Sequence, residues 1–160
     1  MKHAMIVPLL TALSASAAAD DNNAQIMQTL QRWVQGYNEA GPKATTVTCA
    51  DRGAVIGAFP PYFWGGVNAC AHWAQDWEAY AKRNHLAQCR VDLGTPRHLD
   101  VSGDRAYVSL DAELKCNEPG GMRREPGWTW TVALEKAKDG WRIVGYSWGS
   151  PAGSAIKADR

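Results

Sequence analysis

Apolar positions along the chain follow two different periods, which divide the sequence into a helical part and a sheet-forming part. Residues 22–40 and 68–85 place apolar side chains three or four positions apart, the spacing of one face of an α-helix. Gly41-Pro42 is a typical end for the first helix. Between the helices, Thr45–Thr48 and Ala54–Phe59 predict two short strands.

From residue 88 onward apolar and polar positions alternate, which is typical of strands. Short turns between consecutive strands imply an antiparallel meander with one buried face. The whole order predicts an α+β domain with helices packed on one face of a curved sheet. The four expected strands span residues 89–101, 105–116, 128–136 and 141–148.

The N-terminal stretch "MKHAMIVPLLTALSASAAAD" has the pattern of a bacterial-type signal peptide. Lys2 and His3 precede an apolar run, and Ala17-Ala18-Ala19 forms a cleavage site. We therefore expect a signal peptide over 1–19, a single domain over 20–152 and a flexible tail over 153–160. The domain would be periplasmic or secreted. With no cysteine at the cleavage point and no other long apolar stretch, no membrane anchor is predicted.

The four cysteines are predicted to form two disulfides, because an exported chain folds in an oxidising compartment. A hairpin turn near Gly103 places Cys89 opposite Cys116 on the neighbouring strand. Cys49–Cys70 is then the remaining pair. Four free, buried thiols are the alternative if the chain stays in a reducing compartment.

Charge and histidine content argue against several functional classes. The formal net charge is +1 and there is no basic run, so neither nucleic acid nor an anionic membrane surface is an expected partner. The histidines and cysteines have no metal-ligand spacing, so we predict no metal and no cofactor. Tryptophan, by contrast, occurs eight times, which suits a tightly packed core or the wall of a ligand pocket.

Three stretches carry a resemblance to a known family: "QIMQTLQRWVQGYNEAG", "CADRGAVIGAF" and "KDGWRIVGYSW". They are similar to the opening helix, the following strand and the closing strand of the nuclear transport factor 2-like (NTF2-like) superfamily, in its SnoaL-like and ketosteroid-isomerase-like branch. The resemblance implies a cone-shaped, cystatin-like fold: a strongly bent antiparallel sheet around helices, with an apolar pocket at the open end. The superfamily includes enzymes, binding modules and assembly domains, so the fold does not decide the function.

The isomerases of this superfamily use a carboxylate base and an oxyanion hole made of a tyrosine and a protonated aspartate. At the matching positions this chain has Gly57 for the base, Trp33 for the tyrosine, and Trp130 or Thr131 for the aspartate. Tyr37, one helical turn later, could replace the tyrosine. The sequence therefore argues against steroid isomerisation by that mechanism.

The cone implied by the resemblance leads us to expect a pocket for a small apolar or aromatic molecule. In the last strand, alternation places Trp141 and Ile143 on one face and Tyr146 and Trp148 on the other, and we assign the second pair to the pocket. The expected pocket-lining residues are Trp33, Tyr37, Tyr62, Trp64, Trp130, Tyr146 and Trp148.

Two alternatives remain open from the sequence, so whether the protein is an enzyme is undecided. The first is a lyase or isomerase that uses Asp111 with a tyrosine or histidine partner, or His72 oriented by Asp76 one helical turn away. The second is an assembly module that forms a homodimer through the outer face of the sheet. A pocket-facing Asp111 would favour the first, and a broad apolar patch on the sheet would favour the second.

Overall fold

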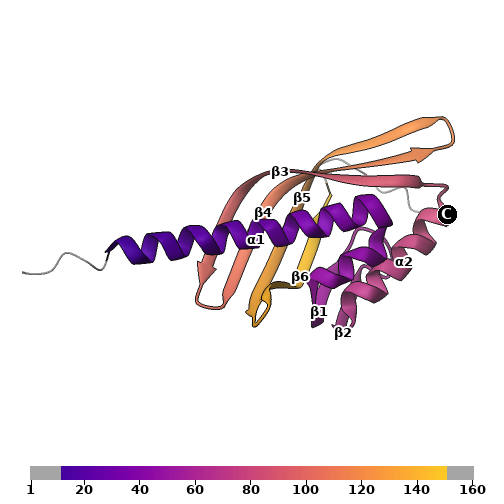
Figure 1. Ribbon diagram of the computed structural model, residues 1–160. Helices are drawn as coiled ribbons and strands as arrows, with labels where there is room; N and C mark the ends of the chain where they lie inside the picture. The colour runs from indigo at the N-terminus through magenta and orange to yellow at the C-terminus, as the bar shows by residue number, and fades with distance from the viewer. Residues whose placement is uncertain (1–11, 151–160) are drawn as a thin grey trace, which may run out of the picture.

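The computed structural model describes residues 12–150, with side chains from residue 19 (Figure 1). Two α-helices, one 3₁₀ helix and six strands follow one another in this part of the chain. In chain order they are α1 (Ala12–Ala40), η1 (Pro42–Thr48), β1 (Cys49–Ile56), β2 (Phe63–Val67), α2 (Ala69–Arg83), β3 (Ala87–Ser102), β4 (Arg105–Glu118), β5 (Gly121–Ala137) and β6 (Gly140–Gly149).

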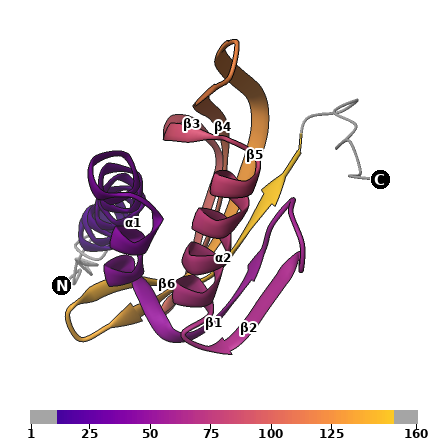
Figure 2. The ribbon, with the colours of Figure 1, turned by 90° about the vertical axis from the view of Figure 1, so that its right-hand side faces the viewer.

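The six strands form one strongly bent sheet in the order β2-β1-β6-β5-β4-β3. The helices lie on its concave side, as Figures 1 and 2 show from two directions. All neighbouring strands are antiparallel except β1 and β6, which run parallel. The predicted α+β class and the antiparallel meander of the last four strands are thus confirmed.

Helix α1 begins at Ala12 rather than at the expected residue 22, so it includes the predicted cleavage point after Ala19. The rest of the predicted signal peptide and the predicted tail, 153–160, lie outside the described residues. Cleavage therefore stays a prediction. No helix in the described part of the chain is long and apolar enough to cross a membrane.

The expected strand over Thr45–Thr48 is wrong, because this segment is part of η1. Pro42 stands at the start of this helix, where its fixed φ is favourable. The threonine hydroxyls donate to carbonyls three residues back: Thr45 to Pro42 O (2.7 Å) and Thr48 to Thr45 O (2.7 Å). These local hydrogen bonds outweigh the β-propensity of the run. The second expected strand is present but shifted, as β1.

Both predicted disulfide pairs are present. Cys89–Cys116 joins β3 to β4, with the two Cα atoms 4.1 Å apart. Cys49–Cys70 joins the start of β1 to the first turn of α2. The two bridges join residues that are 21 and 27 positions apart in the sequence, which restricts the unfolded chain and stabilises the fold.

Simple alternation along β6 is wrong, because a β-bulge at Val144 shifts its register. On β5, Ala133 pairs with Gly145 and the next residue pairs with Ile143, so Val144 has no partner in the ladder. The extra residue changes which side chains face inward. Trp141, Ile143 and Tyr146 are therefore all buried, at 1%, 1% and 4% exposure.

The bulge explains the glycine at position 53. A Cβ on Gly53 would lie 2.4 Å from the carbonyl oxygen of Val144, closer than two such atoms can approach. Backbone atoms on both sides prevent relief by a side-chain rotation. β1 can therefore lie beside the bulge only because position 53 has no side chain.

We expect Gly53→Ala to lower the free energy of unfolding by about 1–3 kcal/mol, the usual cost of overpacking. Urea unfolding with the disulfides intact measures this change. Gly149→Ala is the matched control, because its Cβ would make an ordinary contact of 3.6 Å with Thr129 O. Equal stability of the two variants would contradict the proposed role of Gly53.

Candidate functional site

An aromatic cluster centred on Trp33 fills the concave side of the sheet. Trp33 lies on the inner face of α1 and is fully buried. Its ring centroid lies between 4.8 and 5.9 Å from five other aromatic rings. We name these six residues the Trp33 cluster: Trp33, Tyr37, Trp73, Trp130, Tyr146 and Trp148.

Four elements supply the cluster. Trp33 and Tyr37 lie one turn apart on α1, and their rings stack at 5.5 Å. Trp73 comes from α2. Trp130 and Trp148 are direct cross-strand partners on β5 and β6, stacked at 5.2 Å. Such a set of rings buries a large apolar area and fixes the helices against the sheet.

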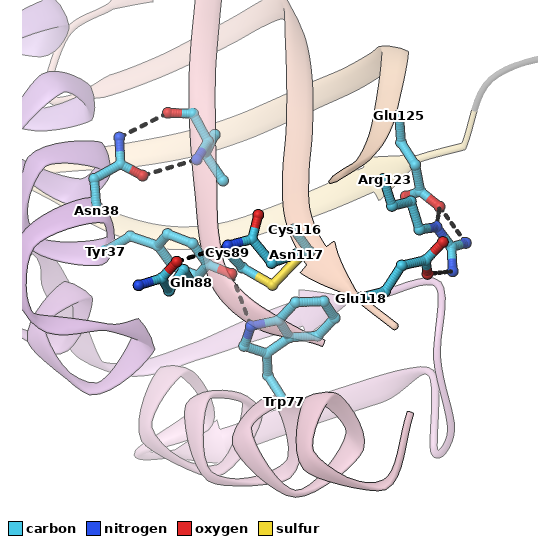
Figure 3. The surroundings of a disulfide bond; sticks show 11 residues. Tyr37, Asn38, Trp77, Gln88, Cys89, Cys116, Asn117, Glu118, Arg123 and Glu125 are labelled. Carbon is cyan, nitrogen blue, oxygen red and sulfur yellow. Dashed lines mark hydrogen bonds and ion pairs between the residues drawn. A yellow bond between two sulfur atoms is a disulfide. The ribbon is translucent and has the colours of Figure 1, made fainter. Parts of the chain in front are cut away.

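A second aromatic group continues the cluster toward β2 and the C-terminal half of α2. Phe59 contacts Trp64, Trp77 and Tyr80, and the Trp77 ring is nearly parallel to that of Trp73. In this group the indole N–H groups have partners. Trp64 Nε1 donates to Asp76 Oδ2 (2.7 Å) and Trp77 Nε1 donates to the Tyr37 hydroxyl (2.8 Å). Figure 3 shows the latter bond in the surroundings of the Cys89–Cys116 disulfide.

The Trp33 cluster differs from this group, because most of its polar atoms have no protein partner. Among the described residues, the buried donors without a protein acceptor are the hydroxyl of Tyr146 and Nε1 of Trp33, Trp73, Trp128, Trp130, Trp141 and Trp148. All of them except Trp128 and Trp141 belong to the Trp33 cluster. A buried donor without an acceptor costs about 1–3 kcal/mol, and folded proteins contain few of them. Their concentration in one cluster distinguishes this place from an ordinary core.

The interior of the cone is also uncharged. In the described part of the chain, the only buried residues with polar or charged side chains outside the aromatic set are Thr29, Thr45 and Thr48. Burial raises the pKa of Tyr37, although the hydrogen bond from Trp77 opposes this, and burial also raises the pKa of Tyr146. Both hydroxyls therefore stay protonated at neutral pH and remain donors. The cluster offers hydrogen-bond donors and aromatic faces, but no base.

Asp111 does not reach this interior. Along β4 the residues Ala106, Val108, Leu110 and Ala112 are buried, so Asp111 points to the outer face. There its side chain is 46% exposed and forms an ion pair with Arg97. The alternative that uses Asp111 as an interior catalytic group thereby loses its geometric basis, because β4 alternates regularly at this point.

His72 also lies away from the cluster. It is exposed on α2, whereas its neighbour Trp73 is buried. Its expected partner Asp76 instead accepts the hydrogen bond from Trp64, and no hydrogen bond or ion pair joins His72 to Asp76 within the described residues. The pair therefore lacks the orientation that acid–base catalysis needs.

Six of the seven expected pocket residues lie in the two aromatic groups, and their contact with a ligand stays a prediction. The exception is Tyr62, whose side chain is 54% exposed at the β1–β2 turn. Sequence reasoning missed Trp73 and Trp77 as site residues. The apolar stripe of α2 was visible in the sequence, but a helical stripe does not show whether it faces a core or a pocket.

A groove of about 620 Å³ lies between α1 and β3, outside the aromatic groups. Asn38, one of its lining residues, pairs with the backbone of Val91 through two hydrogen bonds of 2.8 Å (Figure 3). Amide and apolar side chains line the groove, with Asp92 as the single charged residue among them. Within residues 12–150 no group of histidine, cysteine and acidic side chains is placed to hold a metal ion.

Comparisons with known proteins agree with the fold. The SnoaL-like domain family matches residues 26–152. Among solved structures, the chain is similar to an NTF2-like superfamily protein from Salmonella enterica serovar Typhimurium, with 16% identity and a TM-score of 0.69 over 89% of this chain and 99% of that one. It is also similar to an NTF2-like protein with a cystatin-like fold from Novosphingobium aromaticivorans, with 18% identity and a TM-score of 0.72 over 91% and 92% of the two chains. The search of curated proteins gave no match.

The buried tyrosines predict a loss of stability at alkaline pH. Unfolded tyrosine ionises near pH ~10, whereas burial keeps Tyr37 and Tyr146 protonated above that value in the folded chain. The unfolded state then binds fewer protons, so stability present below pH ~10 is lost as the pH rises, by about 1.4 kcal/mol per pH unit for each tyrosine. Urea unfolding at a series of pH values should show a flatter decline for Tyr146→Phe. An identical pH dependence in both proteins would contradict the shift.

Proposed function

The chain belongs to the SnoaL-like domain family of the NTF2-like superfamily, and we propose that its cone binds a small, uncharged aromatic molecule carrying a hydrogen-bond acceptor such as a carbonyl oxygen. The observation that carries this proposal is the set of unpartnered donors in the Trp33 cluster. A ligand acceptor placed among them would satisfy groups that the protein itself leaves unsatisfied.

The chemistry of the cluster selects the class of ligand. Indole and phenol rings favour a flat, apolar molecule through stacking and edge contacts. The absence of a buried cation among the described residues disfavours a carboxylate or phosphate, whose charge would be buried without a counterion. The buried indole N–H groups are donors only, and the protonated Tyr146 hydroxyl also has a hydrogen to donate, so a ligand that carries an acceptor is complementary to the cluster.

The way in is proposed to lie beside the half-buried rings of Trp77, Trp128 and Trp148, which border the fully buried centre. Trp128 contacts Trp148 edge to face at 6.5 Å. A flat aromatic ligand could replace one ring in this contact. Because the ligand would stack in place of the displaced ring, the exchange would cost the protein little stacking energy. Binding rather than catalysis is the proposed activity, because the described interior holds donors without a base.

The proposed place of action is outside the cytoplasm. The sequence of residues 1–19 has the signal-peptide pattern, and both disulfides of the described chain are compatible with an oxidising compartment. Stability would then come partly from bridges that a reducing compartment does not maintain.

Isothermal titration calorimetry with 1-tetralone and its hydrocarbon analogue tetralin tests the proposal. The two molecules share ring size and differ at the carbonyl, so the ketone should bind more tightly. Tyr146→Phe removes one donor and should weaken 1-tetralone binding about two- to tenfold, the value of one hydrogen bond, while leaving tetralin unaffected.

Tyr62→Phe is the matched control, since it removes an exposed hydroxyl outside the cluster. It should leave the binding of both ligands unchanged. Equal affinities of the wild-type protein for ketone and hydrocarbon would exclude a donor-lined site. A lack of heat with either ligand, together with unchanged tryptophan fluorescence, would overturn binding of this ligand class.

A further inference from the structure

The two edges of the sheet are protected to different degrees. Edge strand β3 contains Pro96, several charged side chains and three register shifts, all of which hinder the addition of another strand. Edge strand β2 has the sequence "FWGGV", without a charge or a proline. Its outer side therefore presents backbone groups that no charge or proline of its own protects, with Gly66 as the one residue of the strand at a positive φ (93°).

Exposed apolar side chains gather on the same hairpin. Ile56, Tyr62, Phe63 and Val67 are 49–60% exposed, and they make up most of the large exposed apolar residues in the described chain. Ile56 and Phe63 are cross-strand partners. The Phe63 ring lies over Gly65, within 2.6 Å of where a Cβ would be, so the apolar surface continues along the strand.

The backbone directions follow from the pairing of β1 with β2. Gly57 N donates to Tyr62 O and Asn68 N donates to Asp51 O, so Tyr62 and Asn68 direct their backbone groups toward β1. In an antiparallel ladder every second residue does the same. Phe63, Gly65 and Val67 therefore direct their N–H and C=O groups to the free edge.

We propose that β2 pairs antiparallel with β2 of a second copy of this chain, across a twofold axis at Gly65. In this register the three outward residues are arranged symmetrically. Gly65 meets Gly65 of the partner subunit, and Phe63 meets the partner's Val67. Every outward backbone group then gains a hydrogen bond, and an exposed aromatic ring packs on an exposed β-branched side chain.

A second copy fits this edge better than a foreign strand does. The strand is self-complementary in both hydrogen bonds and side chains, and it offers no charge with which to select another partner. The outer face of the sheet is a poorer candidate, because ion pairs such as Arg97–Asp111 and Arg124–Glu113 cover it. The dimer therefore forms by extending the sheet rather than by stacking two sheets.

Sedimentation velocity over a range of protein concentrations tests the proposal. The wild-type chain should dimerise, and Phe63→Lys should be monomeric, because it introduces two charges at the interface. Met122→Lys is the matched control: Met122 is 65% exposed at the tip of the β4–β5 hairpin, far from β2 along the chain. A monomeric wild-type protein, or a dimer that survives Phe63→Lys, would overturn the proposal.

Cross-linking fixes the register independently of any effect on folding. The double variant Phe63→Cys/Val67→Cys should form a disulfide-linked dimer under oxidation, because paired residues bring their Cα atoms to about 5.5 Å. Within one chain these positions are about 13 Å apart, too far for a bridge. Phe63→Cys alone should not cross-link at this pair. Failure of the double variant to cross-link would exclude this register.

Discussion

The packing of Trp33 against both helices and the sheet is the contact on which the rest of the structure depends. Its ring contacts residues from α1, α2, β5 and β6. One side chain therefore links the position of both helices to the bend of the sheet. Apolar burial on this scale stabilises the fold. The same burial removes several indole N–H groups from water without giving them protein acceptors. Stability and the proposed binding site therefore have a common origin.

Two hydrogen-bonded anchors hold α1 in the position that this packing requires. Near its middle, the hydroxyl of buried Thr29 is within hydrogen-bond distance of Trp141 O (3.3 Å) on β6. Near its C-terminal end, Asn38 pairs with the backbone of Val91 on β3. The helix is thus fixed to two strands that are far apart in the sheet.

The sequence predicted most of the fold because the relevant signals are local. Apolar period, turn residues and the position of the Gly103 turn are enough to derive the meander and the opposition of Cys89 and Cys116. The predictions of secondary structure failed at two kinds of position. At one, a single extra residue changes the strand register; at the other, a side-chain hydroxyl forms a local hydrogen bond that favours a different backbone conformation. The bulge at Val144 reverses the faces of β6, and the hydroxyl of Thr45 favours a 3₁₀ turn over a strand.

The aromatic character of the candidate site could be predicted from the sequence, but the complete set of residues that form it could not. Aromatic excess and the resemblance to a cone-shaped family pointed to Trp33 and Tyr146, whereas Trp73 lies on a helical stripe that looks like ordinary core. Simple alternation already favoured an outward Asp111, and its ion pair with Arg97 agrees. What no sequence pattern shows is which buried donors lack an acceptor, since that depends on the relative placement of four elements.

The position of β6 has a consequence for how the chain reaches its folded state. This last strand lies inside the sheet, between β1 and β5, and Val55 pairs with Tyr146 near the end of the described chain. A polypeptide that emerges from its N-terminus can form the β1–β2 hairpin and the β3–β5 meander as separate pieces. Only the arrival of β6 joins them into one sheet. Completion of the sheet therefore depends on a pairing between β1 and β6, two strands that are far apart in the sequence, so the last step of sheet formation is also the one with the longest loop to close.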